Sequence, residues 1–375
     1  MRRVLLVFLM LLVNREVEAR NRAVRHFSDC AAITGDLRNV GIAYEEGDRV
    51  VTSPYRRTPN VNGDMILLSD GRTLLGLEGY RLFRSRDDGC SWIGAGVLPY
   101  AAMSLHAAAD GRVFAVEGCC IGDTSAVVRI DGDEIVRLPM PRANIAGFGT
   151  DPADRDRVRA AFETYAGLEL WDSLDGGEHW QQSGAFVCAE GCNPGLWKLA
   201  FFDPADLDHV VATANGTTPL FSSRDGGKTW TAAAGLRTFG TDAGVWSVTF
   251  SPADPGVLWA VGIERLGDTV RRSIWRSADG GATFRLEVEE GDGIYIAAKT
   301  RVTPSRTSPN LGWFSHGDMV GATWLYRHDT ATRTTTIREW HLGFNGIEAI
   351  VQSTLRPDTL RLLFTGPHCE ALCLP

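Results

Sequence analysis

One short pattern occurs four times in this chain of 375 residues, and it constrains the fold more than any other feature. Its form is S-x-D-x-G-x-x-[W/F]. Ser and Asp side chains hydrogen-bond to nearby backbone groups in tight turns, and Gly supplies the positive φ that such turns need. The aromatic residue begins the outgoing strand and packs against a neighbouring sheet. The four copies are Ser85, Asp87, Gly89 and Trp92; Ser173, Asp175, Gly177 and Trp180; Ser223, Asp225, Gly227 and Trp230; and Ser277, Asp279, Gly281 and Phe284.

Strand-like segments surround each turn in a repeating order. Residues 197–204 align with residues 246–252, each segment ends at a proline, and a second apolar segment follows each of them. The repeating unit therefore reads strand, turn, strand, loop, strand, turn, strand. Four antiparallel strands per repeat are typical of a propeller blade. The sequence predicts an all-β fold, a single β-propeller of four-stranded antiparallel blades.

The spacing of the turns predicts the number of blades. Ser173 and Ser223 lie 50 positions apart, and the 88 positions from Ser85 to Ser173 hold two repeats. The repeat between them has a degenerate turn at residues 131–133, and another degenerate repeat spans residues 311–340. A last half-repeat runs over residues 347–364, and we expect residues 39–52 to add its outer strand. Seven blades are expected, with six as the alternative.

The first nineteen residues have the features of a secretory signal peptide. Arg2 and Arg3 precede ten apolar residues, Val4 to Val13, and Ala19 is a small residue of the kind that precedes cleavage. Ten residues are too few for a membrane span, which needs about 20. We expect residues 1–19 to be removed and residues 20–375 to form one secreted or periplasmic propeller domain.

Eight cysteines in an exported chain indicate disulfides rather than metal thiolates. Two pairs are close in sequence and predict small local bridges, Cys188 with Cys192 and Cys369 with Cys373. The pairing of the other four cysteines stays open. Neither a metal site nor a cofactor is expected.

The charge balance limits the partners. The formal net charge is −8, whereas nucleic-acid binding demands a basic face. The sequence has no second apolar segment of membrane length, so we expect a monomer that does not insert into membranes.

The four turns, together with the proline-terminated strands around them, resemble the Asp-box (BNR-repeat) superfamily of propellers. That group includes sialidases, xyloglucanase-type glycosidases, the sortilin ectodomain and photosystem-II assembly factors. The resemblance covers roughly residues 60 to 340 and implies the propeller fold. It also implies that the Asp-box turns lie on the face opposite the active site, so their carboxylates are structural.

The enzymes of this superfamily are matched incompletely. Sialidases carry [F/Y]-R-I-P in an early strand, and only an R-x-P core is found here, at Arg57 and Pro59. Tyr80 stands where the next sialidase arginine is expected. Xyloglucanase-type enzymes place their acid and base on two propellers, and this chain has the length of one.

Any site is therefore expected on the face opposite the Asp-box turns, at the loops between second and third strands. Glu78, Glu117 and Glu163 are candidates for an acid–base pair, with solvated loop carboxylates as the alternative. His316 with Asp318 is a candidate for binding a metal or orienting a base, with a polar loop as the alternative. The ligand-binding candidates are Arg57, Tyr80, Glu264, His316 and Asp318.

The sequence favours an exported, non-enzymatic binding or scaffold protein that recognises a glycan, a peptide or a protein. The alternative is a glycoside hydrolase, sialidase-like or polysaccharide-degrading, with acidic residues on the same face.

Overall fold

The structure is a computed structural model of the chain, and it is described here over thirteen segments. These segments are residues 43–46, 49–52, 63–89, 92–99, 102–117, 126–187, 198–214, 219–236, 244–266, 269–297, 300–317, 322–341 and 346–364. Within them, no helix has the length and apolar character to span a membrane.

The chain forms six four-stranded antiparallel sheets, which confirms the predicted propeller. Blade one contains β3 (Gly63–Leu67), β4 (Leu74–Glu78), β5 (Arg81–Ser85) and β6 (Ile93–Val97). Blade two contains β7 (Ala102–Ala107), β8 (Val113–Glu117), β9 (Ala126–Asp131) and β10 (Glu134–Arg137). Blade three contains β11 (Ile145–Thr150), β12 (Val158–Thr164), β13 (Gly167–Ser173) and β14 (Gln181–Val187).

Blades four to six repeat the same order, and a two-stranded sheet follows them. Blade four contains β15 (Ala200–Asp203), β16 (Asp206–Thr213), β17 (Leu220–Ser223) and β18 (Thr231–Ala232). Blade five contains β19 (Gly244–Phe250), β20 (Leu258–Leu266), β21 (Thr269–Ser277) and β22 (Arg285–Glu289). Blade six contains β23 (Thr303–Pro304), β24 (Leu311–Gly317), β25 (Ala322–Asp329) and β26 (Thr334–His341). The partial blade seven contains β27 (Ile347–Gln352) and β28 (Leu360–Phe364).

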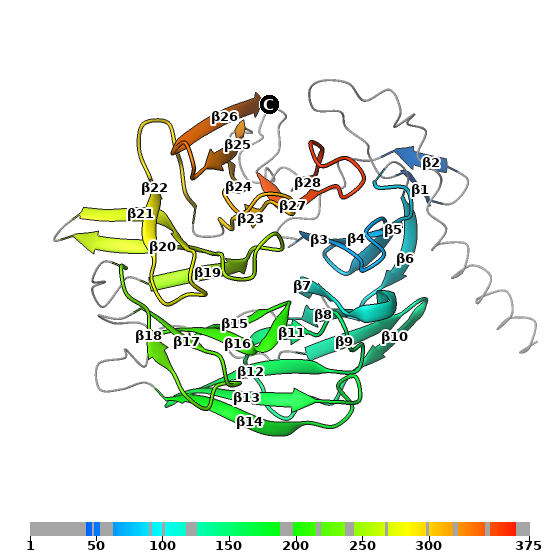
Figure 1. Ribbon diagram of the computed structural model, residues 1–375. Coiled ribbons are helices and arrows are strands. Elements are labelled where there is room, and N and C mark those ends of the chain that lie inside the picture. The colour runs from blue at the N-terminus through cyan, green and yellow to red at the C-terminus, as the bar shows by residue number, and fades with distance from the viewer. Residues whose placement is uncertain are drawn as a thin grey trace, which may run out of the picture.

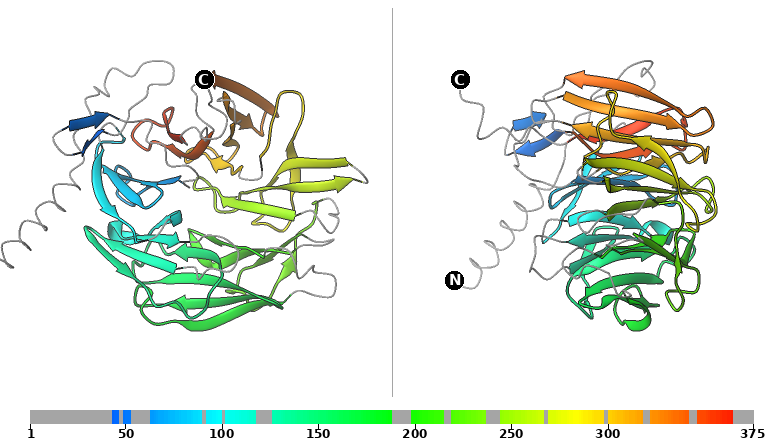
Figure 2. Two further views of the ribbon diagram at one scale, coloured as in Figure 1. Left: turned by 180° about the vertical axis from the view of Figure 1, so that it is seen from behind. Right: turned by 90° about the vertical axis from the view of Figure 1, so that its left-hand side faces the viewer.

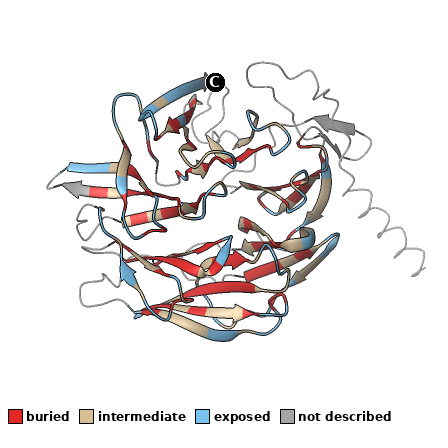
Figure 3. Cartoon of the chain, viewed as in Figure 1, coloured by how far each residue is buried: buried red, intermediate tan, exposed pale blue. Residues whose placement is uncertain are grey.

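The sheets follow one another around a ring in chain order (Figure 1), and the same arrangement is seen from behind and from the side (Figure 2). The first strand of blade one contacts those of blade two and blade seven, so the last sheet meets the first. Seven hydrophobic clusters fill the interfaces between neighbouring sheets. Buried residues accordingly lie along strands that face other strands (Figure 3). The two-stranded sheet thus occupies the seventh position of the ring.

The prediction that residues 39–52 add an outer strand to the last blade is wrong. Its two described segments, β1 (Ala43–Glu46) and β2 (Arg49–Thr52), pair with each other in a sheet of their own. The reason is local: only Gly and Asp separate the two strands, and such a two-residue connection favours a hairpin over pairing with a distant blade.

The four Asp-box turns join the third and fourth strands of blades one, three, four and five. In the third copy, the Gly227 N–H donates to Ser223 Oγ at 2.8 Å, and that hydroxyl donates to Asp225 Oδ1 at 2.8 Å. The Asp225 carboxylate also accepts the backbone N–H of Thr229 at 2.9 Å and its hydroxyl at 2.6 Å. The same Ser–Asp and Gly–Ser bonds recur in the other copies. Each turn is therefore closed by its own side chains.

These bonds lower the pKa of the carboxyls of Asp175, Asp225 and Asp279. For Asp225 the largest cause is the Thr229 hydroxyl, followed by the Thr229 backbone N–H. For Asp175 it is the backbone N–H of His179. Such a group stabilises the fold above its unfolded pKa, near 3.8, and this contribution is lost as the pH falls through the folded value.

We therefore expect Asp225→Asn to lower the thermal midpoint at pH 7, and the gap from the wild type to shrink below about pH 4. Thermal unfolding followed by circular dichroism from pH 7 to pH 2 measures this gap. The control is Asp133→Asn, since the Asp133 side chain is 96% exposed. A gap that stays constant as the pH falls would contradict the role of the ionised carboxylate.

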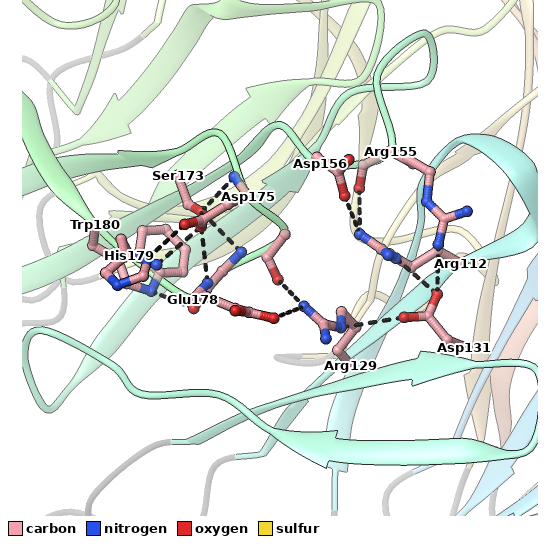
Figure 4. A network of polar contacts seen from close by, with 12 residues as sticks. Arg112, Arg129, Asp131, Arg155, Asp156, Ser173, Asp175, Glu178, His179 and Trp180 are labelled. Carbon is pink, nitrogen blue, oxygen red and sulfur yellow. Dashed lines mark hydrogen bonds and ion pairs between the residues drawn. The ribbon is translucent and has the colours of Figure 1, made fainter.

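Blade two lacks an Asp-box turn, and an ion-pair network takes its place (Figure 4). Asp131 pairs with three arginines, at 2.8 Å from Arg112 Nε, 3.2 Å from Arg129 Nε and 3.1 Å from Arg155 Nη2. Arg129 also donates to the carbonyl of Gly176 in the Asp-box turn of blade three at 3.2 Å. Ion pairs therefore stabilise the degenerate turn, and the hydrogen bond from Arg129 connects it to blade three.

The first Asp-box turn closes the ring. Its Asp88 occupies a position where the other three turns have Gly, and it has the same left-handed backbone, with φ of 59°. The buried Asp88 carboxylate accepts the Ser353 hydroxyl at 2.7 Å and an Arg361 N–H at 2.9 Å. Both partners belong to blade seven, so one carboxylate joins the two ends of the propeller.

Asp88 has two roles: it adopts the positive φ of the turn, and its carboxylate binds blade seven. The substitution Asp88→Gly keeps the first and removes the second. Glycine suits the positive φ, yet the change leaves the guanidinium of Arg361, which is 10% exposed, without its ion-pair partner. We expect the free energy of unfolding to fall by about 3 kcal/mol, measured by urea denaturation. Arg333→Gly is the control, because Arg333 has φ of 54° and is exposed; it should change stability little. An Asp88→Gly protein as stable as the wild type would refute the closing role.

Candidate functional site

The face opposite the Asp-box turns is formed by the turns between second and third strands and by the connections between blades. We call it the loop face. The antiparallel strand order places it there, because the Asp-box turns sit at the other ends of the same strands. Tyr80, Glu163, Glu264 and His316 lie at or beside second-to-third-strand turns, so these candidates share this face.

Glu163 is held in an ion pair between two blades. Its Oε1 lies 3.4 Å from Lys198 Nζ and accepts the Lys198 backbone N–H at 3.3 Å. Lys198 Nζ also donates to the Thr164 carbonyl at 3.4 Å. The Lys198 side chain is 2% exposed, whereas that of Glu163 is 30% exposed. The carboxylate therefore neutralises a buried cation, a role that the sequence did not indicate.

Glu264 lies at the end of β20 and is fully buried. It is paired in register with Arg271 of β21, whose Nη1 donates to Glu289 Oε1 at 2.5 Å. Hydrogen bonding and charge from Glu289, and then charge from Glu264, raise the pKa of Arg271. Glu264 was predicted as a ligand-binding residue; it is buried beside Arg271 in blade five, and the assignment stays a prediction.

Several predicted site residues are not placed. Glu78 and Glu117 lie at the ends of β4 and β8, and their side chains are outside the described part of the structure. The same holds for the whole of Arg57 and Asp318 and for all eight cysteines, including the predicted pairs Cys188, Cys192, Cys369 and Cys373. These assignments stay predictions.

His316 is the predicted residue that the structure brings into a cluster. Its ring stacks on Tyr295 with centroids 5.5 Å apart and an interplanar angle of 28°. Trp324 lies 5.5 Å from His316 and 5.4 Å from Tyr295. Tyr295 comes from the connection between blades five and six, and the other two come from the β24–β25 hairpin. Each of the three rings therefore touches the other two; we call this set the aromatic triad.

Exposed apolar side chains gather on the loop face. Among the described residues, ten large hydrophobic side chains are exposed, and six of them stand at its turns and strand ends. These six are Tyr80, Val97, Tyr165, Val187, Val270 and Tyr295. Leu174 and Leu355 are exposed at the Asp-box end. These six side chains come from blades one, three and five and from the connection that follows blade five.

The inner strands carry an acid, Asp64, and a base, His106, that are both partly buried. Burial raises the pKa of Asp64, whose Oδ2 accepts the Leu105 N–H of blade two at 2.8 Å. Burial, and then the charge of Arg301, lowers the pKa of His106 to about 4. His106 bonds Ser104 at 3.0 Å. Asp64 thus links blades one and two. Among the described residues, no group of three or more His, Cys, Asp or Glu is arranged to hold a metal ion.

A scan against models of known protein families finds no match. The chain is, however, 33% identical over 344 residues to the dispase autolysis-inducing protein of Streptomyces mobaraensis, and the alignment covers 89% of this chain and 88% of that protein. This chain belongs to the family of the dispase autolysis-inducing protein. The family relation extends over nearly the whole ring and is not confined to its repeats.

Xyloglucanases are similar to this chain at a greater distance. A xyloglucanase from a Paenibacillus species is 30% identical over 164 residues, which is 37% of this chain and 16% of that enzyme. The GH74 xyloglucanase of Xanthomonas campestris superposes with a TM-score of 0.56 at 16% identity. That superposition covers 84% of this chain and 53% of the enzyme, so the chain spans about half of its length. It shows a shared fold.

The Glu163–Lys198 ion pair is expected to stabilise the fold. Glu163→Gln removes the charge beside a buried ammonium, so we expect the free energy of unfolding to fall by about 1–3 kcal/mol in urea denaturation. The control is Glu169→Gln, because its partner Arg142, at 3.0 Å, is 56% exposed whereas Lys198 is 2% exposed. A cation that stays in contact with water loses little when its partner is removed, about 0–1 kcal/mol. Equal losses in the two variants would show that Glu163 is an ordinary surface carboxylate.

Proposed function

We propose that this protein is an exported, non-enzymatic propeller that binds a protease through its loop face and induces the protease to cleave itself. Residues 1–19 act as the signal peptide in this proposal, and residues 20–375 act as a monomeric binding domain. The supporting observation is the relation to the dispase autolysis-inducing protein, which is 33% identical and aligns over 88% of its length. That name gives its target as dispase and its effect as autolysis.

The site supports binding in preference to catalysis. Glu163, the one proposed acid–base residue whose side chain is described, is engaged by Lys198. The loop face instead presents exposed apolar and aromatic side chains. Aromatic residues are enriched at the centres of protein interfaces, so this face suits a protein partner.

Binding alone is sufficient to promote self-cleavage. A protease opens locally, and a partner that binds an opened form more tightly than the closed form shifts the population towards it. A second protease molecule then cuts the exposed segment. The propeller supplies a rigid surface and needs no reactive group of its own.

The direct test incubates the purified chain with dispase and follows intact dispase by gel electrophoresis and mass spectrometry. We expect intact dispase to disappear several-fold faster, in proportion to the amount of chain added, and its fragments to carry cleavage sites of dispase itself. Dispase blocked at its active site should bind the chain and stay intact. Heat-unfolded chain is the control for nonspecific effects.

Two matched variants locate the surface. Tyr80→Ser with Tyr165→Ser alters the loop face, and Leu174→Ser with Leu355→Ser alters the Asp-box end; all four side chains are exposed. Loss of induction in the first variant and its retention in the second would support the proposal. Unchanged dispase lifetime with the native chain would contradict it. Release of oligosaccharides from xyloglucan would favour the hydrolase, which the local match to the Paenibacillus enzyme motivates.

A further inference from the structure

The connection between blades five and six holds Tyr295 in a fixed position. The backbone forms paired hydrogen bonds between Gly291 and Ile294 at 3.0 and 2.9 Å. Asp292 and Gly293 between them both have positive φ, 51° and 84°, as in a type I′ turn. The Tyr326 hydroxyl accepts the Tyr295 N–H at 3.1 Å and donates to the Gly293 carbonyl at 3.3 Å. The tyrosine is therefore displayed on a tight, pinned turn.

The side chain of Tyr295 packs against two other rings and is still partly exposed to solvent. It stacks on His316 and lies tilted against Trp324, yet the residue remains 48% exposed. A half-exposed aromatic ring that is already immobilised loses little conformational entropy when a partner covers it. Tyrosine and tryptophan are also the side chains most enriched at binding hot spots. The aromatic triad has the properties of a preformed anchor site.

The charges around the triad are acidic. Asp292 is exposed at the tip of the turn that presents Tyr295. Glu339 lies in register with Trp324 on the neighbouring strand β26 and so shares its face of the sheet. The nearby arginines of β21 are already engaged, Arg271 with Glu289 at 2.5 Å and Arg272 with Glu290 at 3.2 Å. Asp292 and Glu339 therefore add two carboxylates near the aromatic triad.

We propose that the aromatic triad of Tyr295, His316 and Trp324 docks a basic side chain, an arginine or a lysine, of the protein partner. The cation lies over the exposed face of Tyr295, where the ring quadrupole attracts it, and the carboxylates of Asp292 and Glu339 flank it. This inference rests on the proposed function, because it names the part of the loop face that holds the protease. A neutral sugar would gain nothing from the two flanking carboxylates.

The first experiment measures the affinity of the chain for active-site-blocked dispase by biolayer interferometry. Tyr295→Ala should weaken binding about tenfold or more, Tyr295→Phe should keep most of the affinity because the ring face remains, and Tyr295→Leu should lose it. Leu355→Ala, exposed at the Asp-box end, should bind as the wild type does. Unchanged thermal midpoints show that the variants fold. If the native chain binds dispase and Tyr295→Ala binds equally, the docking site is refuted while the proposed function stands.

The second experiment tests the site without any protease. The native chain is titrated with N-acetyl-arginine amide, and the indole N–H signal of Trp324 is followed by NMR, assigned as the signal missing from Trp324→Phe. We expect a shift with the arginine compound and none with N-acetyl-citrulline amide, which has the same shape without the charge. The site then stands even if the native chain fails to bind dispase. Equal shifts with both compounds, no shift, or a shift with xyloglucan oligosaccharides alone would overturn it.

Discussion

The rest of the structure depends on the contact between blade seven and blade one. Six complete sheets form a curved array, and this array becomes a ring only where the last sheet packs on the first. Met65, Leu74 and Phe83 of blade one pack there with Ala349 and Val351 of blade seven, and Asp88 binds Ser353 and Arg361 across the same junction. The contact joins residues about 270 positions apart, so it forms at a high cost in chain entropy. Once formed, it removes the open end that would otherwise expose an apolar face.

The two faces of the closed ring carry different kinds of side chain. On one face, the Asp-box turns and the arginine network around Asp131 hold the outer strands and tie each blade to the next. On the other, the described turns and connections display exposed tyrosines and the aromatic triad. A rigid scaffold suits recognition, because the partner meets side chains whose positions are already fixed. The chain belongs to the family of the dispase autolysis-inducing protein, and contact with a protease is our proposal for it.

The fold was predictable because its signal is local and repeated. Eight consecutive residues specify each Asp-box turn. The spacing between the turns also predicts the blades that have no Asp-box turn. The predictions that failed or were missed depend on contacts between distant residues or on a local preference. The local case is β1 and β2, which form their own hairpin because the two residues between them favour it. Lys198 and Asp88 were missed because their partners lie on other blades. The triad needed the register of β24 with β25, which the sequence does not specify. The turn that presents Tyr295 does have a sequence signal, because Asp292 and Gly293 form a pair typical of type I′ turns. The disulfide pairs and the side chains of Glu78 and Glu117 stay predictions.

Hydrogen–deuterium exchange of this protein, alone and with active-site-blocked dispase, tests the central claim most directly. It compares both faces of the ring in one measurement. The account predicts that the partner slows exchange in the turns β4–β5, β12–β13 and β20–β21 and in residues 290–297, and leaves the four Asp-box turns unchanged. Protection confined to the Asp-box turns, or the absence of protection on either face, would contradict a loop face that binds a protease.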